Sequence, residues 1–263
     1  MEKVNAVVLR AAGINCDLET EYALELAGAS AQRIHINRII RDKKLLEQFQ
    51  IMVFPGGFSY GDDVAAGKIM ANQITHYLSE AIKKFIDDGK LVLGICNGFQ
   101  ILVKSGILPG GDNGQLGCHD MVTITYNDSG KFEDRWVYLA PQTEKCVFIE
   151  PGRQIYLPIA HGEGKLTTKD QATLEKLKSD KQIAFKYVDK DGRQGGYPVN
   201  PNGSIDSIAG LTDATGRVLG LMPHPERFTR HTQHPHFSRL ESRKIGDGMT
   251  IFANAVKFVK QNF

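Results

Sequence analysis

A cysteine at position 96 stands among residue types that could make its sulfur a nucleophile. The segment Gly94-Ile-Cys96-Asn-Gly98 has the Gly-x-nucleophile-x-Gly spacing of a tight turn between a strand and a helix. Glycine is needed two positions before and after the nucleophile, because side chains would collide there. The N–H groups of a helix that begins after the turn favour the thiolate over the thiol. The pentapeptide alone would also fit a buried cysteine at an ordinary strand–helix junction, so the rest of the chain has to decide.

A histidine and a carboxylate lie close together in the segment Met222-Pro-His224-Pro-Glu226-Arg227. A cysteine nucleophile needs a base that takes its proton and later protonates the leaving group, and histidine does this near neutral pH. A carboxylate two residues away along an extended chain lies on the same side and can fix the tautomer of the base. The prolines predict that extended conformation, because they disfavour helix. A surface turn would also fit these residues, but a sequence-distant cysteine and histidine are usual in such sites.

Adjacent glycines occur in the segment Pro55-Gly-Gly57-Phe-Ser-Tyr-Gly-Asp-Asp63, directly after a short apolar run. Gly56 and Gly57 would let backbone N–H groups approach a substrate oxygen closely, as an oxyanion hole requires. A simple tight turn is the alternative interpretation of a glycine pair. A phosphate-binding loop is disfavoured, since no Gly-Lys-Ser/Thr follows.

The first half of the chain, which must position these segments, alternates strands with helices. Apolar runs without periodicity predict strands buried on both faces, and the alternation predicts a parallel sheet covered by helices. Because ligands bind at the carboxyl ends of such strands, the segments around Gly57 and Cys96 should face one crevice. Asp17 or Thr20 is expected to cap the first helix, which ends at Gly28. The other expected elements are strands at 5–10, 31–36, 51–54 and 91–95 and helices at 42–49, 68–88 and 98–104.

The second half of the chain shows a different pattern. Residues 121–126 and 135–139 alternate with period two, which is typical of antiparallel strands with one exposed face. We expect further strands at 155–159, 182–188 and 217–222, a helix at 170–178 and an ordered loop over 192–210. The predicted fold is therefore α/β, with a doubly wound, mostly parallel sheet, helices on both faces and additional antiparallel strands. We expect one domain over residues 1–263, with a C-terminal extension after about residue 227.

The composition argues against several classes of protein. Of the 263 residues 41% are hydrophobic, which is enough for a full core. The net charge of +2 gives no basic field for nucleic acid. The chain has neither a signal-peptide pattern nor an apolar stretch of transmembrane length, so we expect a soluble cytoplasmic protein without a membrane partner. The scattered cysteines indicate neither a zinc site nor a disulfide framework: Cys16, Cys96, Cys118 and Cys146.

Taken together, the segments around Cys96, Gly57 and His224 resemble the class I (triad) glutamine amidotransferases. The residues around each motif are most similar to those of the glutaminase subunits of phosphoribosylformylglycinamidine synthases. The turn at 11–17 and the segment Pro158-Ile-Ala-His161-Gly-Glu163-Gly164 also match, so the resemblance extends over nearly the whole chain.

The resemblance implies a reaction and a role for each residue. Cys96 would attack the side-chain amide of glutamine to give a glutamyl thioester and ammonia, with His224 as acid and base and Glu226 orienting it. Backbone N–H groups of Gly57, beside Gly56, and of Asn97 would form the oxyanion hole. Gln100 would hold the nucleophile turn or the substrate.

The resemblance also implies partners. Ammonia would pass to a separate synthetase subunit, which uses ATP and magnesium to convert formylglycinamide ribonucleotide to its amidine, and a small third subunit would bridge the two. We expect no cofactor and no metal in this chain, which has no ATP-binding signature.

Several alternatives stay open at this point. The triad could serve another acceptor, or the fold could act as a non-catalytic regulatory subunit, although three chemically competent residues argue against that. A cysteine peptidase tends to carry its histidine soon after the nucleophile, and residues 97–118 contain none. His161 and Glu163 could be structural, partner-facing or catalytic. The histidines of 230–236 lack a carboxylate or cysteine that would complete a metal site, so a solvated loop is expected.

Overall fold

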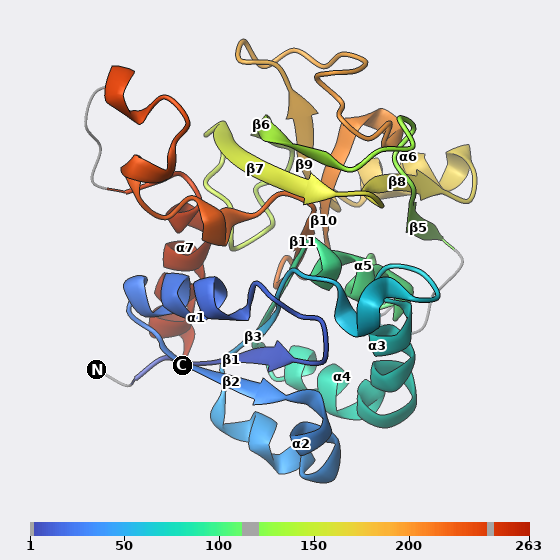
Figure 1. Cartoon of the computed structure of the whole chain (residues 1–263). Coiled ribbons are helices and arrows are strands. Elements are labelled where there is room, and N and C mark those ends of the chain that lie inside the picture. The colour runs from blue at the N-terminus through green and yellow to red at the C-terminus, as the bar shows by residue number, and fades with distance from the viewer. Residues whose placement is uncertain (1–2, 112–120, 241–244) are drawn as a thin grey trace.

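One large mixed sheet runs through the protein, as seen in a computed structural model that describes residues 3–111, 121–240 and 245–263 (Figure 1). Its nine strands follow the order β2-β1-β3-β4-β11-β10-β9-β6-β7. The first five in this order are parallel, and each later strand is antiparallel to its neighbour. The strands, in the same order, are Ser30–His35, Asn5–Arg10, Ile51–Phe54, Leu91–Ile95, Val218–Leu221, Ile208–Thr212, Ile183–Val188, Glu133–Pro141 and Ile155–His161. A separate two-stranded ribbon joins β5 and β8, Val122–Thr125 and Lys165–Thr168.

Helices cover both faces of the parallel part of the sheet, which confirms the predicted fold class. Figure 1 shows α1 (Asp17–Leu26) and α7 (Met249–Asn262) together on one face. The opposite face carries α3 (Lys68–Gln73), α4 (Ser79–Asp87) and α5 (Asn97–Lys104). The remaining helices lie beside β2 and β8, namely α2 (Ile36–Arg41) and α6 (Gln171–Ser179). None of the helices in the described ranges is both long and apolar enough to cross a bilayer.

The burial pattern of the strands explains their sequence patterns. Every residue of β3 and of β4 is buried, because helices pack on both faces of the central strands. The residues of β7 alternate between buried and partly exposed, because one face of this edge strand packs on the core. The aperiodic apolar runs and the period-two alternation therefore predicted the two kinds of strand correctly.

The structure corrects several predicted helices. The single helix expected at 68–88 is divided by a π turn at Ile74–Leu78, whose two end residues are both buried. The helix expected at 42–49 is a 3-10 helix over Lys43–Gln48, and α2 precedes it. The predicted caps of α1 are also wrong. Cys16 occupies the N-cap position, because the Asp17 carboxylate binds the Arg10 and Arg33 guanidinium groups instead.

Two strands, β8 and β10, and two helices, α2 and α7, were missed from the sequence. The strand β8 is short. The strand β10 begins within the stretch 192–210 that was expected to be a loop, and its Gly210 interrupts the apolar pattern of a strand. A side chain there would collide with the neighbouring strand, since a Cβ would lie 2.7 Å from the carbonyl oxygen of Gly220. Helix α7 follows residue 227 and buries Phe252 and Val256 in the same core as the sheet. The expected division into one domain with an extension stays a prediction.

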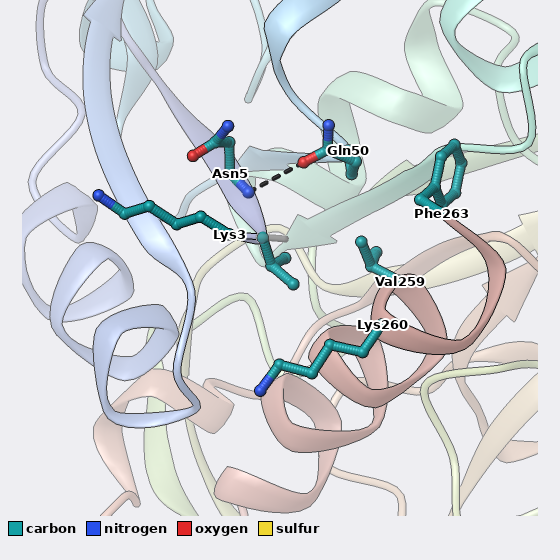
Figure 2. Close-up of a pocket in the computed structure, with 7 residues that line it drawn as sticks. Lys3, Asn5, Gln50, Val259, Lys260 and Phe263 are labelled. Atoms are coloured by element: carbon teal, nitrogen blue, oxygen red, sulfur yellow. Dashed lines mark hydrogen bonds between the residues drawn. The ribbon is translucent and has the colours of Figure 1, made fainter. Parts of the chain in front are cut away.

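One cavity lies at the amino ends of the parallel strands, away from the segments around Gly57, Cys96 and His224. It has a volume of about 520 Å³ and opens beside the C-terminal turn of α7 (Figure 2). Open α/β sheets bind ligands at the carboxyl ends of their strands, so this cavity is not the site that the sheet topology favours. Among the described residues its lining contains two lysines but no cysteine, histidine or carboxylate side chain: Lys3, Val4, Asn5, Gln50, Val259, Lys260 and Phe263.

The contact between α5 and β3 generates a stability prediction. A Cβ on Gly98 would lie 1.8 Å from the carbonyl oxygen of Phe54, so Gly98→Ala has to push the helix away from the strand. We expect this variant to lose about 2–3 kcal/mol or more of unfolding free energy, measured by urea denaturation. Gly196→Ala is the matched control, because a Cβ there meets nothing within 4 Å. Equal stabilities of the two variants would contradict the close packing.

Candidate active site

Cys96 lies in the turn between β4 and α5, and its backbone is strained. Its φ of +50° and ψ of −105° are rare for a residue with a side chain. Gly94 is required two residues earlier, because a Cβ there would lie 2.8 Å from the carbonyl oxygen of Gly98. The turn therefore has the local geometry that the glycine spacing predicted. It holds the sulfur at the first turn of a helix, 3.7 Å from the Ala160 carbonyl oxygen.

His224 and Glu226 form a buried pair directly after β11. The His224 Nδ1 lies 2.6 Å from the Glu226 Oε1, and both side chains are almost fully buried. Because a carboxylate only accepts hydrogen bonds, Nδ1 carries the proton and donates it. This leaves Nε2 as the nitrogen that can exchange a proton with a nucleophile, and Nε2 has no hydrogen-bond partner among the described residues. The pair has the geometry of a base and its orienting carboxylate.

The backbone that produces this pair differs from the expected one. His224 is extended, with φ −104° and ψ 92°, but Pro225–Arg227 forms a 3-10 turn. The two side chains therefore meet around a turn and not along an extended strand. The prolines act differently from the prediction, since Pro225 occupies the first position of the turn, where its missing N–H costs nothing. The His224 N–H donates to the Pro158 carbonyl oxygen at 2.8 Å, which fixes the start of the turn.

The electrostatic surroundings of His224 favour its charged form. Burial opposes a buried imidazolium, but the negative charges of Glu226 and Cys96 outweigh that penalty and raise the pKa of His224 well above its usual range. Cys96 is thus close enough to His224 for its charge to act on the imidazole. An imidazolium beside the sulfur stabilises a thiolate, which is the reactive form of a cysteine.

The glycine pair approaches both the base and the loop that follows β1. A Cβ on Gly56 would lie 2.8 Å from the His224 Cε1, and one on Gly57 would lie 2.7 Å from the Asn15 nitrogen. The Gly56 carbonyl oxygen accepts a hydrogen bond from the Cys16 N–H at 3.2 Å. This contact fixes the orientation of the peptide between the two glycines. No described residue accepts a hydrogen bond from the Gly57 N–H, which leaves this donor for a ligand.

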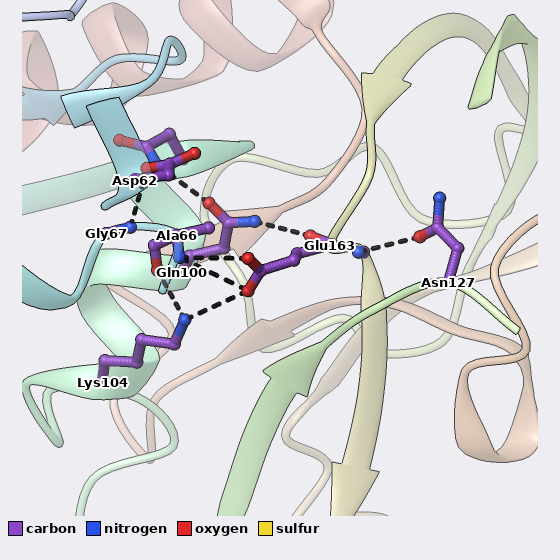
Figure 3. Close-up of polar contacts among 9 residues, drawn as sticks. Asp62, Ala66, Gly67, Gln100, Lys104, Asn127 and Glu163 are labelled. Carbon is purple, nitrogen blue, oxygen red and sulfur yellow. Dashed lines mark hydrogen bonds and ion pairs between the residues drawn. The ribbon is translucent and has the colours of Figure 1, made fainter. Parts of the chain in front are cut away.

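Asn97 and Gln100 hold the nucleophile turn against its neighbours. The Asn97 side chain accepts from the Ser59 N–H at 3.2 Å and donates to the Gln100 Oε1 at 2.9 Å. The Gln100 Nε2 donates to the Glu163 carbonyl oxygen at 2.5 Å (Figure 3). In this structure the side chain of Gln100 is thus engaged with protein groups on both ends. The Asn97 N–H starts α5 and has no helical acceptor, as in the first turn of any helix.

Cys16 is a residue of the site that sequence analysis missed. Its sulfur lies 3.1 Å from the Arg227 Nη2 and within 4.8 Å of ligand atoms of His224 and Glu226. Burial raises the pKa of the Cys16 thiol, so it stays protonated near neutral pH. Cysteine, histidine and glutamate are zinc-ligand types, but the guanidinium on the sulfur and the existing His224–Glu226 bond describe a supported base, not a cation site.

Of the other two cysteines, the structure describes Cys146. Cys146 is fully buried, and burial raises the pKa of its thiol to about 12. Such a thiol is inert. Cys118 lies outside the described residues.

His161 is buried near His224 in a neutral form. Its Nδ1 lies 3.1 Å from the Asn127 Oδ1, which also accepts from the Gly164 N–H at 2.9 Å. Burial, and then the charge of His224, lower the pKa of His161 to about 3. Gly164 has to be glycine, because a Cβ there would lie 2.3 Å from the His161 ring. Packing against the His161 ring therefore accounts for Gly164.

The segment 230–236 was expected to be a solvated loop, and this is correct only in part, because one of its histidines packs against aromatic rings. His234 packs among Trp136, Tyr156 and Phe228, with ring centroids 5.4–5.7 Å away. These rings attach the segment after residue 227 to the outer face of β6 and β7. The apolar partners lie in strands far away in the sequence, so the local pattern could not predict the contact.

The pKa of His161 generates a prediction for stability against pH. The folded protein keeps His161 neutral down to about pH 3, whereas the unfolded chain protonates it below about pH 6.5. The unfolded state therefore binds an extra proton as the pH falls, and wild-type stability decreases. In urea unfolding, His161→Gln should gain about 2–3 kcal/mol relative to wild type between pH 7 and pH 4.5. A constant difference between the two proteins across that range would contradict the low pKa.

Comparisons with known proteins show which family the chain is similar to. The profile of the CobB/CobQ-like glutamine amidotransferase domain matches residues 3–259. A phosphoribosylformylglycinamidine synthase subunit PurQ from Dehalococcoides mccartyi is 48% identical over 263 residues, covering 99% of this chain and 100% of the relative. The PurQ subunit of Archaeoglobus fulgidus is 40% identical over 99% of this chain and 98% of its own length.

A solved structure gives the same result for the fold. A chain in the structure of PurLQS from Thermotoga maritima superposes with a TM-score of 0.72 and 30% identity, covering 98% of this chain and 100% of that one. The agreement in sequence and fold extends over nearly the whole length of each protein. The chain therefore belongs to the CobB/CobQ-like glutamine amidotransferase family, among the PurQ subunits of phosphoribosylformylglycinamidine synthases.

Proposed function

We propose that the chain is the glutaminase subunit of a phosphoribosylformylglycinamidine synthase and hydrolyses glutamine through Cys96, His224 and Glu226. The observation that carries the proposal is the buried His224–Glu226 pair beside a strained cysteine at a helix N-terminus. The family to which the chain belongs supports glutamine as the substrate. Thiolate, base and carboxylate are the set that acyl transfer from an amide requires.

The reaction follows from the roles that these groups can take. The Cys96 thiolate attacks the amide carbon of glutamine, and the negative charge on the oxygen is stabilised by the N–H groups of Gly57 and Asn97. The His224 imidazolium protonates the leaving nitrogen from Nε2, which releases ammonia and leaves a glutamyl thioester. Neutral His224 then takes a proton from water as the water attacks the thioester, and glutamate leaves as the thiolate and the imidazolium are restored. Gly56 and Gln100 position these groups.

The ammonia goes to a partner, because the family name describes a synthase with more than one subunit. The Thermotoga maritima structure is titled as PurLQS, and we propose a corresponding assembly with a synthetase subunit and a small bridging subunit. The synthetase would use ATP and magnesium to convert formylglycinamide ribonucleotide to formylglycinamidine ribonucleotide. The proposed location of this assembly is the cytoplasm.

Substitutions in the proposed triad test the chemistry. Cys96→Ala removes the nucleophile, and we expect it to abolish glutamate release from glutamine. Glu226→Gln keeps the size of the side chain but no longer stabilises the imidazolium, so kcat should fall by about 10³-fold or more. Both assays should include the synthetase subunit from the same genome, with ATP, magnesium and formylglycinamide ribonucleotide.

Two outcomes of this assay would change the assignment. If wild type releases glutamate but does not respond to the synthetase, the acceptor is a different one, while the glutaminase stands. If Cys96→Ala retains wild-type activity, the proposed nucleophile is wrong. Cys146→Ala is the matched control, because it removes a buried thiol distant from His224.

A further inference from the structure

One face of α5 is polar, although the helix is otherwise buried. Asn97, Gln100 and Lys104 are three and four residues apart and so lie on the same side. Figure 3 shows that Gln100 and Lys104 reach toward Glu163, which lies in the turn His161–Gly164. Glu163 has no role in the proposed chemistry. This polar face begins one residue after Cys96. A segment that binds to it is therefore kept at a fixed position relative to Cys96.

The segment after Gly57 needs such support, because its backbone is strained. Tyr60, Gly61 and Asp62 all have φ between +54° and +71°, and Gly67 has φ +73°. A left-handed conformation costs a residue with a side chain about 1 kcal/mol or more, so the segment does not hold this shape by itself. Contacts from neighbouring elements must keep it in place.

Glu163 and Lys104 together hold the peptide groups of one residue in that segment. The Ala66 N–H lies 3.3 Å from both carboxylate oxygens of Glu163, and the Lys104 Nζ donates to the Ala66 carbonyl oxygen at 2.6 Å. The two side chains are 3.6 Å apart and only 11% and 12% exposed. A shielded ion pair of this kind fixes geometry, since loss of either partner leaves the other charge without compensation.

The opposite side of the same loop is held by the segment after β1. The Phe58 N–H donates to the Gly13 carbonyl oxygen at 2.9 Å, and the Tyr60 N–H donates to the Ala12 carbonyl oxygen at 2.7 Å. The loop with the Gly57 N–H is therefore clamped between two supports. The Ala66 clamp connects it to the helix of Cys96, in addition to the contact between the Asn97 side chain and the Ser59 N–H.

We propose that Glu163 and Lys104 are positioning residues of the glutaminase: their ion pair holds Ala66 and so keeps the Gly57 N–H aligned with Cys96. This inference rests on the proposed function, because it assigns a role in the same reaction. An oxyanion donor acts in the transition state, so its displacement lowers kcat while KM stays nearly constant. Alkylation of a thiolate by iodoacetamide uses no oxyanion donor and should be unaffected.

The test uses the double variant Glu163→Gln/Lys104→Met, which removes both charges and leaves no unpaired buried one. We expect kcat for glutamate release, with the synthetase present, to fall by about tenfold to hundredfold. KM should change less than about threefold, and alkylation of Cys96, followed by mass spectrometry, less than about twofold. The single variant Glu163→Gln keeps an oxygen acceptor for the Ala66 N–H but leaves the Lys104 charge without compensation, so it should also lower kcat.

The matched control is Lys84→Met/Asp88→Asn, which neutralises an ion pair on the surface of α4. It should match wild type in kcat and in alkylation. A wild-type kcat in Glu163→Gln/Lys104→Met would overturn the inference, and so would an equal loss of kcat and alkylation, which indicates general disorder of the site. Absence of glutaminase activity in wild type would instead reject the proposed function, so the two failures are distinguishable.

Discussion

The candidate site depends on the parallel pairing of three central strands. Phe54 of β3 pairs with Gly94 of β4, and Ile95 of β4 pairs with Leu221 of β11. The glycine pair, Cys96 and His224 each follow a strand end by a few residues, so this register alone brings them to one edge of the sheet. A shift of one residue in either pairing would move a whole segment by about 3.3 Å and separate nucleophile, base and donor. The buried apolar runs of β3 and β4 oppose such a shift, because their side chains are packed on both faces.

The loops at this edge are held by side chains and peptide groups of distant segments. Cys96, Tyr60 and Asp62 all have strained backbone conformations, which persist only where the surroundings determine them. The loop after β1 supplies one set of contacts and the polar face of α5 supplies another. Local strain and external support therefore occur together, as expected where a few atoms must be kept in fixed positions.

Two buried histidines near the site show how the surroundings decide the chemistry of a residue type. Glu226 and Cys96 offset the burial of His224 and raise its pKa, whereas His161 faces the neutral side chain of Asn127 and has a lowered pKa of about 3. His224 can therefore carry a proton through a reaction cycle, and His161 stays neutral as a structural donor to Asn127. Both lie in motifs of similar appearance in the sequence. Their different roles follow from the negative charges of Glu226 and Cys96 beside His224.

The sequence by itself determined the α/β class, most of the strands and the segments around Cys96, Gly57 and His224, because glycine spacing, apolar periodicity and side-chain chemistry are local properties. Only the tertiary structure decided the 3-10 turn that joins His224 to Glu226, the place of Cys16 beside them, and the clamp of Glu163 and Lys104 on Ala66. It also decided β10 and α7, which the sequence pattern did not reveal. The physical reason is common to these cases: each contact joins backbone or side chains whose relative positions are fixed by packing, and no local pattern encodes the distance between segments far apart in the chain.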